Sequence, residues 1–173
     1  AGRLKALLEK MGYRDRNGAW RHADRAAIFV GDLIDRGPQQ SDTLEIVRDM
    51  IEAGTARATM GNHEFNAIAW LTQDPTKPDA FLRSHEPHHL KQHEAFLAEF
   101  RDRKKEHEKW VQWFWELPLW IEEPSLQVVH ACWSSRHVEF LRPKLKDGVL
   151  LTPEILELGC RKDANRDGEV TVY

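Results

Sequence analysis

The sequence has little of several features that mark specialised classes of protein. Its two cysteines are too few for a disulfide framework, which favours a reducing compartment. No apolar run approaches the roughly 18–20 residues of a membrane span, and the opening stretch AGRLKALLEKMGY lacks the basic-then-apolar order of a signal peptide. A formal charge of −3 gives no net attraction to nucleic acid or to an anionic membrane. We therefore expect a cytoplasmic protein without nucleic-acid or membrane partners.

The length and composition predict one globular domain. The 173 residues include seven tryptophans and seven phenylalanines, which supply core material, and a 31% charged fraction suits a solvated surface. No internal repeat, low-complexity tract or linker divides the chain. The sequence opens inside a helical pattern and closes in the strand-like alternation EVTVY. We therefore expect a single domain over residues 1–173 that is truncated at both ends.

The first half of the chain predicts a strand–helix–strand unit. Residues 26–30 form an apolar strand, residues 42–53 form a helix that Asp42 caps, and ARATM (56–60) forms a second strand. This order predicts parallel strands and a right-handed crossover. In open α/β sheets, ligands bind outside the carboxyl ends of the strands. The stretches GDLIDRGP and GNHE follow the two strands, so we expect both polar clusters at one rim.

The remaining elements are predicted from simpler patterns. RDRNGAWRHADR (14–25) is expected to be a polar turn, and residues 64–71 a helix. A charged, amphipathic stretch suggests a helical insertion at about 72–117, and LPLWIEEPSLQVVHACW reads as a hairpin whose second strand ends at His130. A last helix is expected near 152–160, with Thr152 as its cap and Pro153 at its first position.

The polar residues at the strand ends form a set with a specific chemistry. Asp32, Asn62, His63 and His130 offer carboxylate, amide and imidazole groups, which ligate Mn²⁺, Fe²⁺ or Zn²⁺. Arg36 presents a planar fork that matches phosphate oxygens. Such a set suits phosphoryl hydrolysis in which two metal ions acidify a bridging water. A salt-bridged turn around residues 32–36 and a core position for His130 are the structural alternatives.

Three of these stretches resemble the motifs of a known superfamily. GDLIDRG and GNHE are similar to the second and third motifs of the calcineurin-like metallophosphoesterases, and VVHACW is similar to the strand-plus-histidine motif that follows. The combination of DRG with GNHE resembles the branch of serine/threonine protein phosphatases, their bacterial and phage relatives, and symmetrical diadenosine tetraphosphatases. The resemblance covers roughly residues 1–135. It implies an α/β (α+β) fold, a four-layer α/β/β/α sandwich, here with a helical insertion.

The resemblance also implies a ligand set for two divalent metal ions. Asp32 would bridge the two ions, and Asn62 and His130 would ligate the second one. Manganese is the favoured metal, with iron or zinc as alternatives. The superfamily's first motif, Asp-x-His-Gly, and its late Gly-His motif are not found, and HAC departs from the branch's usual HGG or HAG. A truncated chain is the preferred explanation, and a relative that has lost its metals is the other.

The same resemblance assigns catalytic roles. His63 would protonate the leaving oxygen, Asp35 would orient His63, and Arg36 would hold the phosphate oxygens. Glu64 is expected to support the loop or cap the following helix. The implied activity is hydrolysis of a phosphorylated substrate, with a broad phosphatase acting on phosphoproteins or small phosphomonoesters as the first choice. A dinucleoside polyphosphate hydrolase and a metal-free scaffold or regulatory relative are the alternatives.

Four further stretches carry competing interpretations. The histidines of SHEPHHLKQHEAF are expected on a solvated helix, with a metal site at His89 and His93 or a substrate-facing role as alternatives. The run RDRKKEHEK is expected to be a solvent-exposed helix with i,i+4 charge pairs. WVQWFWELPLW is expected in the core, although it could line a base-stacking groove. DANRDGEV (163–170) copies half of a calcium loop, but a plain Asp-Gly turn is preferred.

Overall fold

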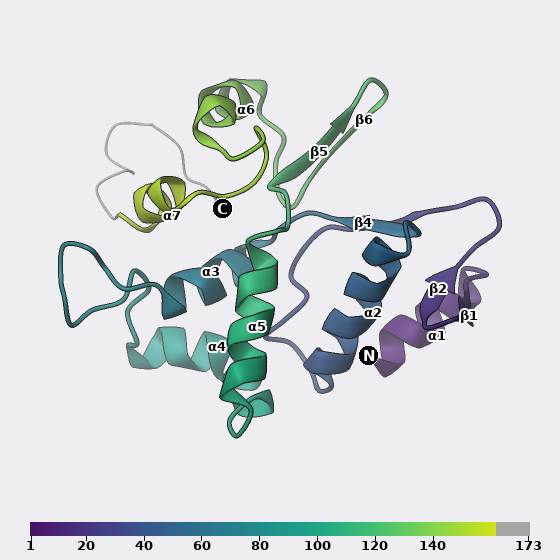
Figure 1. The fold of residues 1–173 in the computed structure, drawn as a ribbon, viewed down its shortest axis with the longest axis horizontal. Helices are drawn as coiled ribbons and strands as arrows, with labels where there is room; N and C mark the ends of the chain where they lie inside the picture. Colours follow the sequence, from purple (N-terminus) through teal and green to yellow (C-terminus); the bar gives the residue numbers. More distant parts are fainter. Residues whose placement is uncertain (162–173) are drawn as a thin grey trace.

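The computed structural model describes residues 1–161 and contains the predicted strand–helix–strand unit. Strands β3 (Ala27–Phe29) and β4 (Ala56–Ala58) are parallel and are joined by helix α2 (Gln40–Glu52), which packs against β4. Both strands therefore end on the same side, and Figure 1 shows α2 beneath β4. This arrangement brings together the loops that follow residues 30 and 60, as the sequence predicts.

Helix α2 begins earlier than expected. Its N-cap is Gln39, which has a left-handed backbone (φ 62°), and no side chain caps the helix. The prediction that Asp42 is the cap is therefore wrong. Asp42 lies in the first turn, where its negative charge faces the positive end of the helix dipole. The left-handed residue before the helix, rather than a capping side chain, marks its start.

The N-terminal segment contains a hairpin that was not predicted. Helix α1 (Gly2–Lys10) is followed by antiparallel strands β1 (Arg14–Arg16) and β2 (Ala19–Arg21), where a polar turn was expected. Between them, Asn17 and Gly18 have φ values of 56° and 84°. Positive φ at both central residues is what a two-residue turn needs to match strand twist, and Asn-Gly favours it. The hairpin closes a small core built from α1, β2 and α2.

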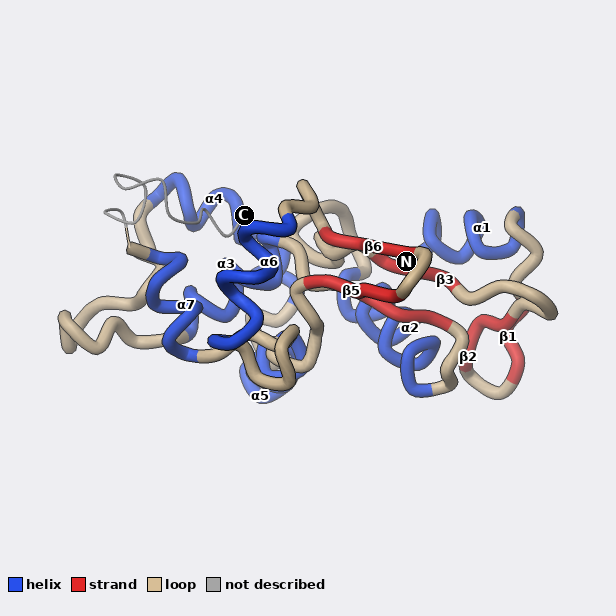
Figure 2. The backbone as a smooth tube through the Cα atoms, turned by 90° about the horizontal axis from the view of Figure 1, so that it is seen from above, coloured by secondary structure: helices blue, strands red, loops and turns tan. Residues whose placement is uncertain are grey.

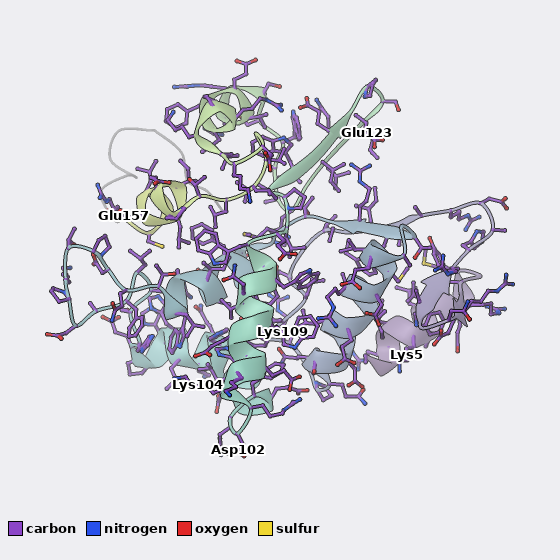
Figure 3. All side chains as sticks on the ribbon, in the orientation of Figure 1. Lys5, Asp102, Lys104, Lys109, Glu123 and Glu157 are labelled. Atoms are coloured by element: carbon purple, nitrogen blue, oxygen red, sulfur yellow. The ribbon has the colours of Figure 1, made fainter. Side chains whose placement is uncertain are left out.

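The predicted helical insertion is present as two helices. Helix α3 (Asn62–Leu71) leads into a loop, then α4 (Pro87–Glu99) and α5 (Lys104–Phe114), and α5 packs against α3. Lys104 and Lys109 point away from α5 in Figure 3, and Lys104 pairs with Glu108 at 3.7 Å. The predicted i,i+4 pairs are thus present, but the prediction that the whole run 101–109 is an exposed helix is wrong, because the helix begins at Lys104 and His107 is buried. The opposite face is apolar and buried, and it includes Trp110.

The C-terminal third contains the strand that ends directly before His130. The predicted hairpin is confirmed as antiparallel strands β5 (Trp120–Glu123) and β6 (Leu126–Val129). Helix α6 (Ser135–Leu141) and the short 3-10 helix η1 (Arg142–Lys144) were not predicted. Helix α7 (Pro153–Cys160) is confirmed, and Thr152 accepts a hydrogen bond from the Ile155 amide as predicted. The stretch DANRDGEV lies outside the described residues.

The described residues confirm the α/β class. They contain three two-stranded sheets among seven α-helices, and Figure 2 shows β3 to β6 in the middle, with α1 toward one end. The main core joins α2, α3 and α5 to the β5–β6 hairpin and α7, and it includes Trp110 and Trp120, as expected for the tryptophan-rich stretch. Within residues 1–161, no helix combines the length and apolar character that a membrane crossing requires.

One buried histidine makes the stability of this fold depend on pH. His107 on α5 is 8% exposed, its ring lies 5.0 Å from that of Phe96, and its Nε2 has no hydrogen-bond partner among the described residues. Burial lowers the pKa of His107 to about 4. Between pH 6.5 and 4 the unfolded chain therefore binds the additional proton, so stability falls as the pH falls.

We expect the free energy of unfolding to decrease by on the order of 3 kcal/mol as the pH falls from 7.5 to 4 through this residue alone, since one pKa unit corresponds to about 1.4 kcal/mol. Urea unfolding of the wild type and of His107→Phe at both pH values measures it. The variant should lose less stability on acidification, whereas the exposed control His88→Phe should behave as the wild type. An identical pH dependence in all three proteins would contradict this assignment.

Candidate active site

The loops after β3 and β4 touch through their backbones. A Cβ atom on Gly31 would lie 2.3 Å from the Gly61 nitrogen, and one on Gly61 would lie 2.6 Å from Asp32 Oδ1. Neither position has room for a side chain, and Gly31 also has a φ of 77°. The polar clusters that the sequence placed at one rim are therefore in direct contact.

A buried carboxylate joins the two loops. Glu64 is fully buried; its Oε2 accepts hydrogen bonds from the Asp32 and Gly61 amides, both at 2.9 Å, and its Oε1 accepts one from Leu33 at 2.7 Å. Burial raises the pKa of Glu64, although these backbone hydrogen bonds act against the rise. The expectation that Glu64 supports the loop is confirmed.

The loop after β3 holds two non-glycine residues in the left-handed region. Asp32 has a φ of 56° and Asp35 a φ of 69°, a conformation that costs free energy for residues with a Cβ. Glu64 fixes the Asp32 amide, and Gln40 Oε1 accepts a hydrogen bond from the Asp35 amide at 2.7 Å. These bonds hold both carboxylates in their positions.

Asp32, Asn62 and His130 converge at the rim. His130 Nε2 lies 3.2 Å from Asn62 Oδ1 and 3.4 Å from Asp32 Oδ1. The hairpin that carries His130 is fixed beside β4 because the Met60 amide donates to the Pro118 carbonyl. His130 is half-buried and belongs to this cluster, not to the core.

The donor set fits a divalent metal ion. Asp32 Oδ1 is buried and has no hydrogen-bond partner among the described residues. His130 Nδ1 faces the Val30 carbonyl oxygen, which can only accept, so Nδ1 carries a proton, and Nε2 is the nitrogen directed at Asn62 and Asp32. A carboxylate oxygen without a partner, an amide oxygen and an imidazole nitrogen are typical ligands of such ions.

Next to this cluster, Asp35 lies between two histidines. Its Oδ2 is 2.8 Å from His63 Nδ1, and its Oδ1 is 2.8 Å from His93 Nδ1. Burial acts to raise the pKa of Asp35, but the hydrogen bonds with His63 and His93 outweigh it and leave the pKa lowered. The hydrogen bond to Asp35 raises the pKa of His63, against the effect of burial. The predicted His63–Asp35 pair is therefore formed, with His63 biased toward its protonated state.

His93 was assigned to a solvated helix, and this assignment is wrong. The residue is buried, and its ring lies 5.3 Å from the ring of Phe96. The signal that could have revealed it is spacing, because His93 and Phe96 share one face of α4 at i and i+3, and Phe100 follows directly after the helix.

The alternative metal site at His89 and His93 is not formed among the described residues, because the ligand atoms that gather around His89 are those of Glu86 and His88 and not that of His93. His85 and His88 are exposed, as expected for a solvated segment. Ligand atoms of Glu86, His88 and His89 do lie within 4.8 Å of one another at the surface, so this group could hold a metal ion.

Arg36 is exposed and lines a pocket of about 370 Å³ beside His63. Arg83, which no sequence motif marks, lines the same pocket from the loop before α4. The complete lining comprises Asp35, Arg36, Asn62, His63, Asn66, Arg83, Gln92 and His93. The predicted catalytic residues thus share one cavity with side chains of the helical insertion.

Comparison with known proteins gives the family. Residues 2–135 match the calcineurin-like phosphoesterases, and the chain belongs to this family. Over 152 residues it is 30% identical to the asymmetrical bis(5'-nucleosyl)-tetraphosphatase PrpE of Bacillus subtilis strain 168, which covers 85% of this chain and 59% of that protein. It is 29% identical over 150 residues to the PrpE of Bacillus velezensis, covering 84% of this chain and 57% of that protein.

A shorter match reaches a second type of tetraphosphatase. Over 41 residues the chain is 49% identical to the symmetrical bis(5'-nucleosyl)-tetraphosphatase of Ralstonia nicotianae, covering 24% of this chain and 14% of that protein. No solved structure matches the chain. The chain spans less than two thirds of the length of the PrpE relatives it matches.

The first prediction for the site concerns Glu64. Glu64→Ala leaves the amides of Asp32, Leu33 and Gly61 without their acceptor, and each unsatisfied buried donor costs about 1–3 kcal/mol. We expect the variant to be destabilised by roughly 3 kcal/mol or more in urea unfolding. The exposed control Glu108→Ala should change stability by less than about 0.5 kcal/mol. Equal stabilities of the two variants would show that Glu64 does not hold the loops together.

The second prediction concerns the charge on His63. Replacing Asp35 by Asn removes the hydrogen-bonded carboxylate that most strongly raises the pKa of His63. In Asp35→Asn the pKa of His63 should therefore fall below its wild-type value, as followed by NMR titration of the imidazole C–H resonances. The exposed His88 serves as the internal control and should titrate identically in both proteins. A His63 titration that does not move would refute the assigned interaction.

Proposed function

We propose that this site hydrolyses phosphoesters with the help of two divalent metal ions. The observation that carries the proposal is the convergence of Asp32, Asn62 and His130 beside the His63–Asp35 pair. Arg36 lines the adjoining pocket. A ligand cluster, a candidate acid and a guanidinium within one rim are groups that metal-assisted phosphoryl transfer uses.

In this proposal Asp32 would hold both ions, and Asn62 and His130 would ligate the second. Manganese is the proposed metal, with iron or zinc as alternatives, because carboxylate, amide and imidazole ligands suit all three. When bound, such a pair supplies an acidified water and positive charge at the phosphate. The unpartnered Asp32 oxygen, and the direction of His130 Nε2 toward Asp32 and Asn62, support these assignments.

The other proposed roles, proton donation and phosphate binding, are carried by side chains of the protein and not by the metal ions. His63 carries the proton that the leaving oxygen needs, and its hydrogen bond to Asp35 both raises its pKa and fixes the orientation of its ring. His63 Nε2 lies 3.8 Å from Asp32 Oδ2, so the acid faces the proposed metal ligands. Arg36 is placed to hold the phosphate oxygens through its planar fork.

The names of the relatives indicate the substrate class more specifically than the residues of the rim do. The rim residues bind a phosphate group and do not select what is attached to it. The sequence favoured a broad phosphatase for phosphoproteins or small phosphomonoesters, whereas the relatives are named as bis(5'-nucleosyl)-tetraphosphatases. We therefore place a dinucleoside polyphosphate first among the substrates to be tested.

We further propose that residues 1–173 form a single domain with a helical insertion at about 72–117, and that the protein is cytoplasmic.

The test is turnover by the protein in its full natural length. Hydrolysis of p-nitrophenyl phosphate and of diadenosine tetraphosphate is measured with Mn²⁺ and with EDTA. We expect metal-dependent turnover that falls by about 100-fold or more in His63→Ala, since a positioned general acid contributes about 10²–10⁴-fold. Asp32→Asn should lower the affinity for Mn²⁺ together with the rate. The controls His88→Ala and Asp102→Asn change exposed residues and should retain wild-type activity.

Two outcomes would contradict the proposal. If the folded protein neither turns over substrate nor takes up metal, the metal-free scaffold or regulatory alternative replaces it. If turnover persists in His63→Ala and Asp32→Asn, the reaction takes place at another site.

A further inference from the structure

Asp35 forms hydrogen bonds with two histidines, and the proposed reaction uses only one of them, His63. The other, His93, is 3% exposed, which is too little for direct contact with a substrate. We propose that His93 is a positioning residue: it fixes the plane of the Asp35 carboxylate, and this carboxylate in turn fixes the ring of His63. The inference goes beyond the proposed function by adding a residue of the helical insertion, and it rests on that function for the role of His63.

The Asp35 carboxylate is held at both of its oxygens. Oδ2 lies 2.8 Å from His63 Nδ1 on α3, and Oδ1 lies 2.8 Å from His93 Nδ1 on α4. The terminal torsion of an aspartate side chain is broad and roughly two-fold, so a hydrogen bond at one oxygen alone leaves the plane of the carboxylate free to turn. Hydrogen bonds at both oxygens, from two different helices, fix that plane and the direction in which Oδ2 meets His63.

The ring of His93 is itself confined by aromatic neighbours. It lies 5.5 Å from the ring of Trp70 on α3 and 5.3 Å from the ring of Phe96 on α4, and both of these side chains are buried. Closely packed side chains in a protein interior have little room to move. His93 therefore gives Asp35 a partner whose position is fixed by the packing of α4 against α3.

The burial of His93 has a cost that an apolar side chain would avoid. Its Nε2 is buried and has no hydrogen-bond partner among the described residues, and such an atom loses its hydration without compensation. The other ring nitrogen, Nδ1, is paired with the carboxylate that orients the proposed acid. Residues that break the rules of core composition are expected where function requires them. The choice of histidine at this position is thus explained by Asp35 and not by packing.

The direction of the His63 ring decides whether its second nitrogen reaches the rim. His63 Nε2 lies 3.8 Å from Asp32 Oδ2, and a rotation of the ring would move it away from the proposed metal ligands. A misplacement of about 1 Å can lower a rate by about 10²-fold. Loss of the hydrogen bond from His93 should therefore lower the rate of the proposed reaction without weakening substrate binding.

The experiment compares turnover of p-nitrophenyl phosphate with Mn²⁺ by the protein in its full natural length and by three variants, His93→Leu, His93→Asn and His107→Leu. Asparagine keeps an N–H donor bonded to Cγ, as Nδ1 is in histidine, whereas leucine removes the donor. His107 is the matched control, because it is buried, its ring lies 5.0 Å from that of Phe96, and its Nε2 has no hydrogen-bond partner within residues 1–161.

The expected result separates kcat from KM. In His93→Leu, kcat should fall by about tenfold or more while KM changes by less than about twofold, because the acid is misplaced and the phosphate site is intact. In His93→Asn, kcat should return to within about threefold of the wild type, since the donor to Asp35 is restored. His107→Leu should keep the wild-type kcat.

A second readout does not depend on turnover. Proton NMR follows the His63 Nδ1 proton, which its hydrogen bond to Asp35 protects from exchange with water. This resonance should be sharp in the wild type, His93→Asn and His107→Leu, and broadened by exchange in His93→Leu. If thermal melting shows that His93→Leu does not fold, His93→Gln replaces it. Glutamine keeps the side chain polar but carries its donor one methylene further from the backbone, so kcat should fall by about threefold or more.

Three outcomes would overturn the inference: a wild-type kcat with a sharp His63 resonance in the folded leucine or glutamine variant, an equal loss of kcat in His107→Leu, and a loss that His93→Asn does not restore. A His63 resonance that depends on His93 in a protein without turnover retains the positioning of His63 and rejects the hydrolase. Metal-dependent turnover that is indifferent to His93 retains the hydrolase and rejects the inference.

Discussion

The carboxylate of Glu64 is the group on which the rest of the site depends. It accepts hydrogen bonds from the amides of Asp32, Leu33 and Gly61, and thereby joins two loops that are about thirty residues apart in the sequence. Each of those amides would otherwise be a donor without a partner near the protein interior, which is costly. The same three bonds hold Asp32 in its left-handed conformation and begin helix α3, from which Asn62 and His63 project. One buried side chain thus sets the positions of proposed metal ligands and of the proposed acid.

The helical insertion is part of this arrangement and more than a cover. His93 on α4 forms a hydrogen bond with the second carboxylate oxygen of Asp35. Gln92 on α4 accepts a hydrogen bond from Arg83 at the wall of the pocket. The residues proposed to act on a phosphate come from the strand ends, while Gln92 and His93, which line the same pocket, come from α4. The contact between His93 and Asp35 joins these two groups of residues, so the position of α4 and the orientation of His63 are physically coupled.

Much of the fold could be predicted because its signals are local. The parallel strands, the β5–β6 hairpin and the Thr152 cap follow from periodicity and turn chemistry, and the rim follows from where parallel strands end. The β1–β2 hairpin was missed although Asn17–Gly18 signalled it. The start of α2 was misplaced because Gln39 adopts a left-handed backbone that glycine or asparagine adopts more readily. The burial of His93 was missed although its spacing with Phe96 signalled a buried face. The contact of His93 with Asp35 and that of Arg83 with Asn66 could not be predicted, because both cross between segments and no local pattern specifies which elements α4 packs against.

The backbone contact between Gly31 and Gly61 also determines how the site responds to change elsewhere. Where side chains separate two loops, their spacing varies with the volume of those side chains and with their rotamers. Here the loops meet main chain to main chain, so peptide geometry sets the separation of Asp32 and Asn62. Substitutions that enlarge or shrink core residues alter stability without directly changing this spacing. The core of the protein is therefore free to diverge in sequence while the separation of the rim ligands stays constant.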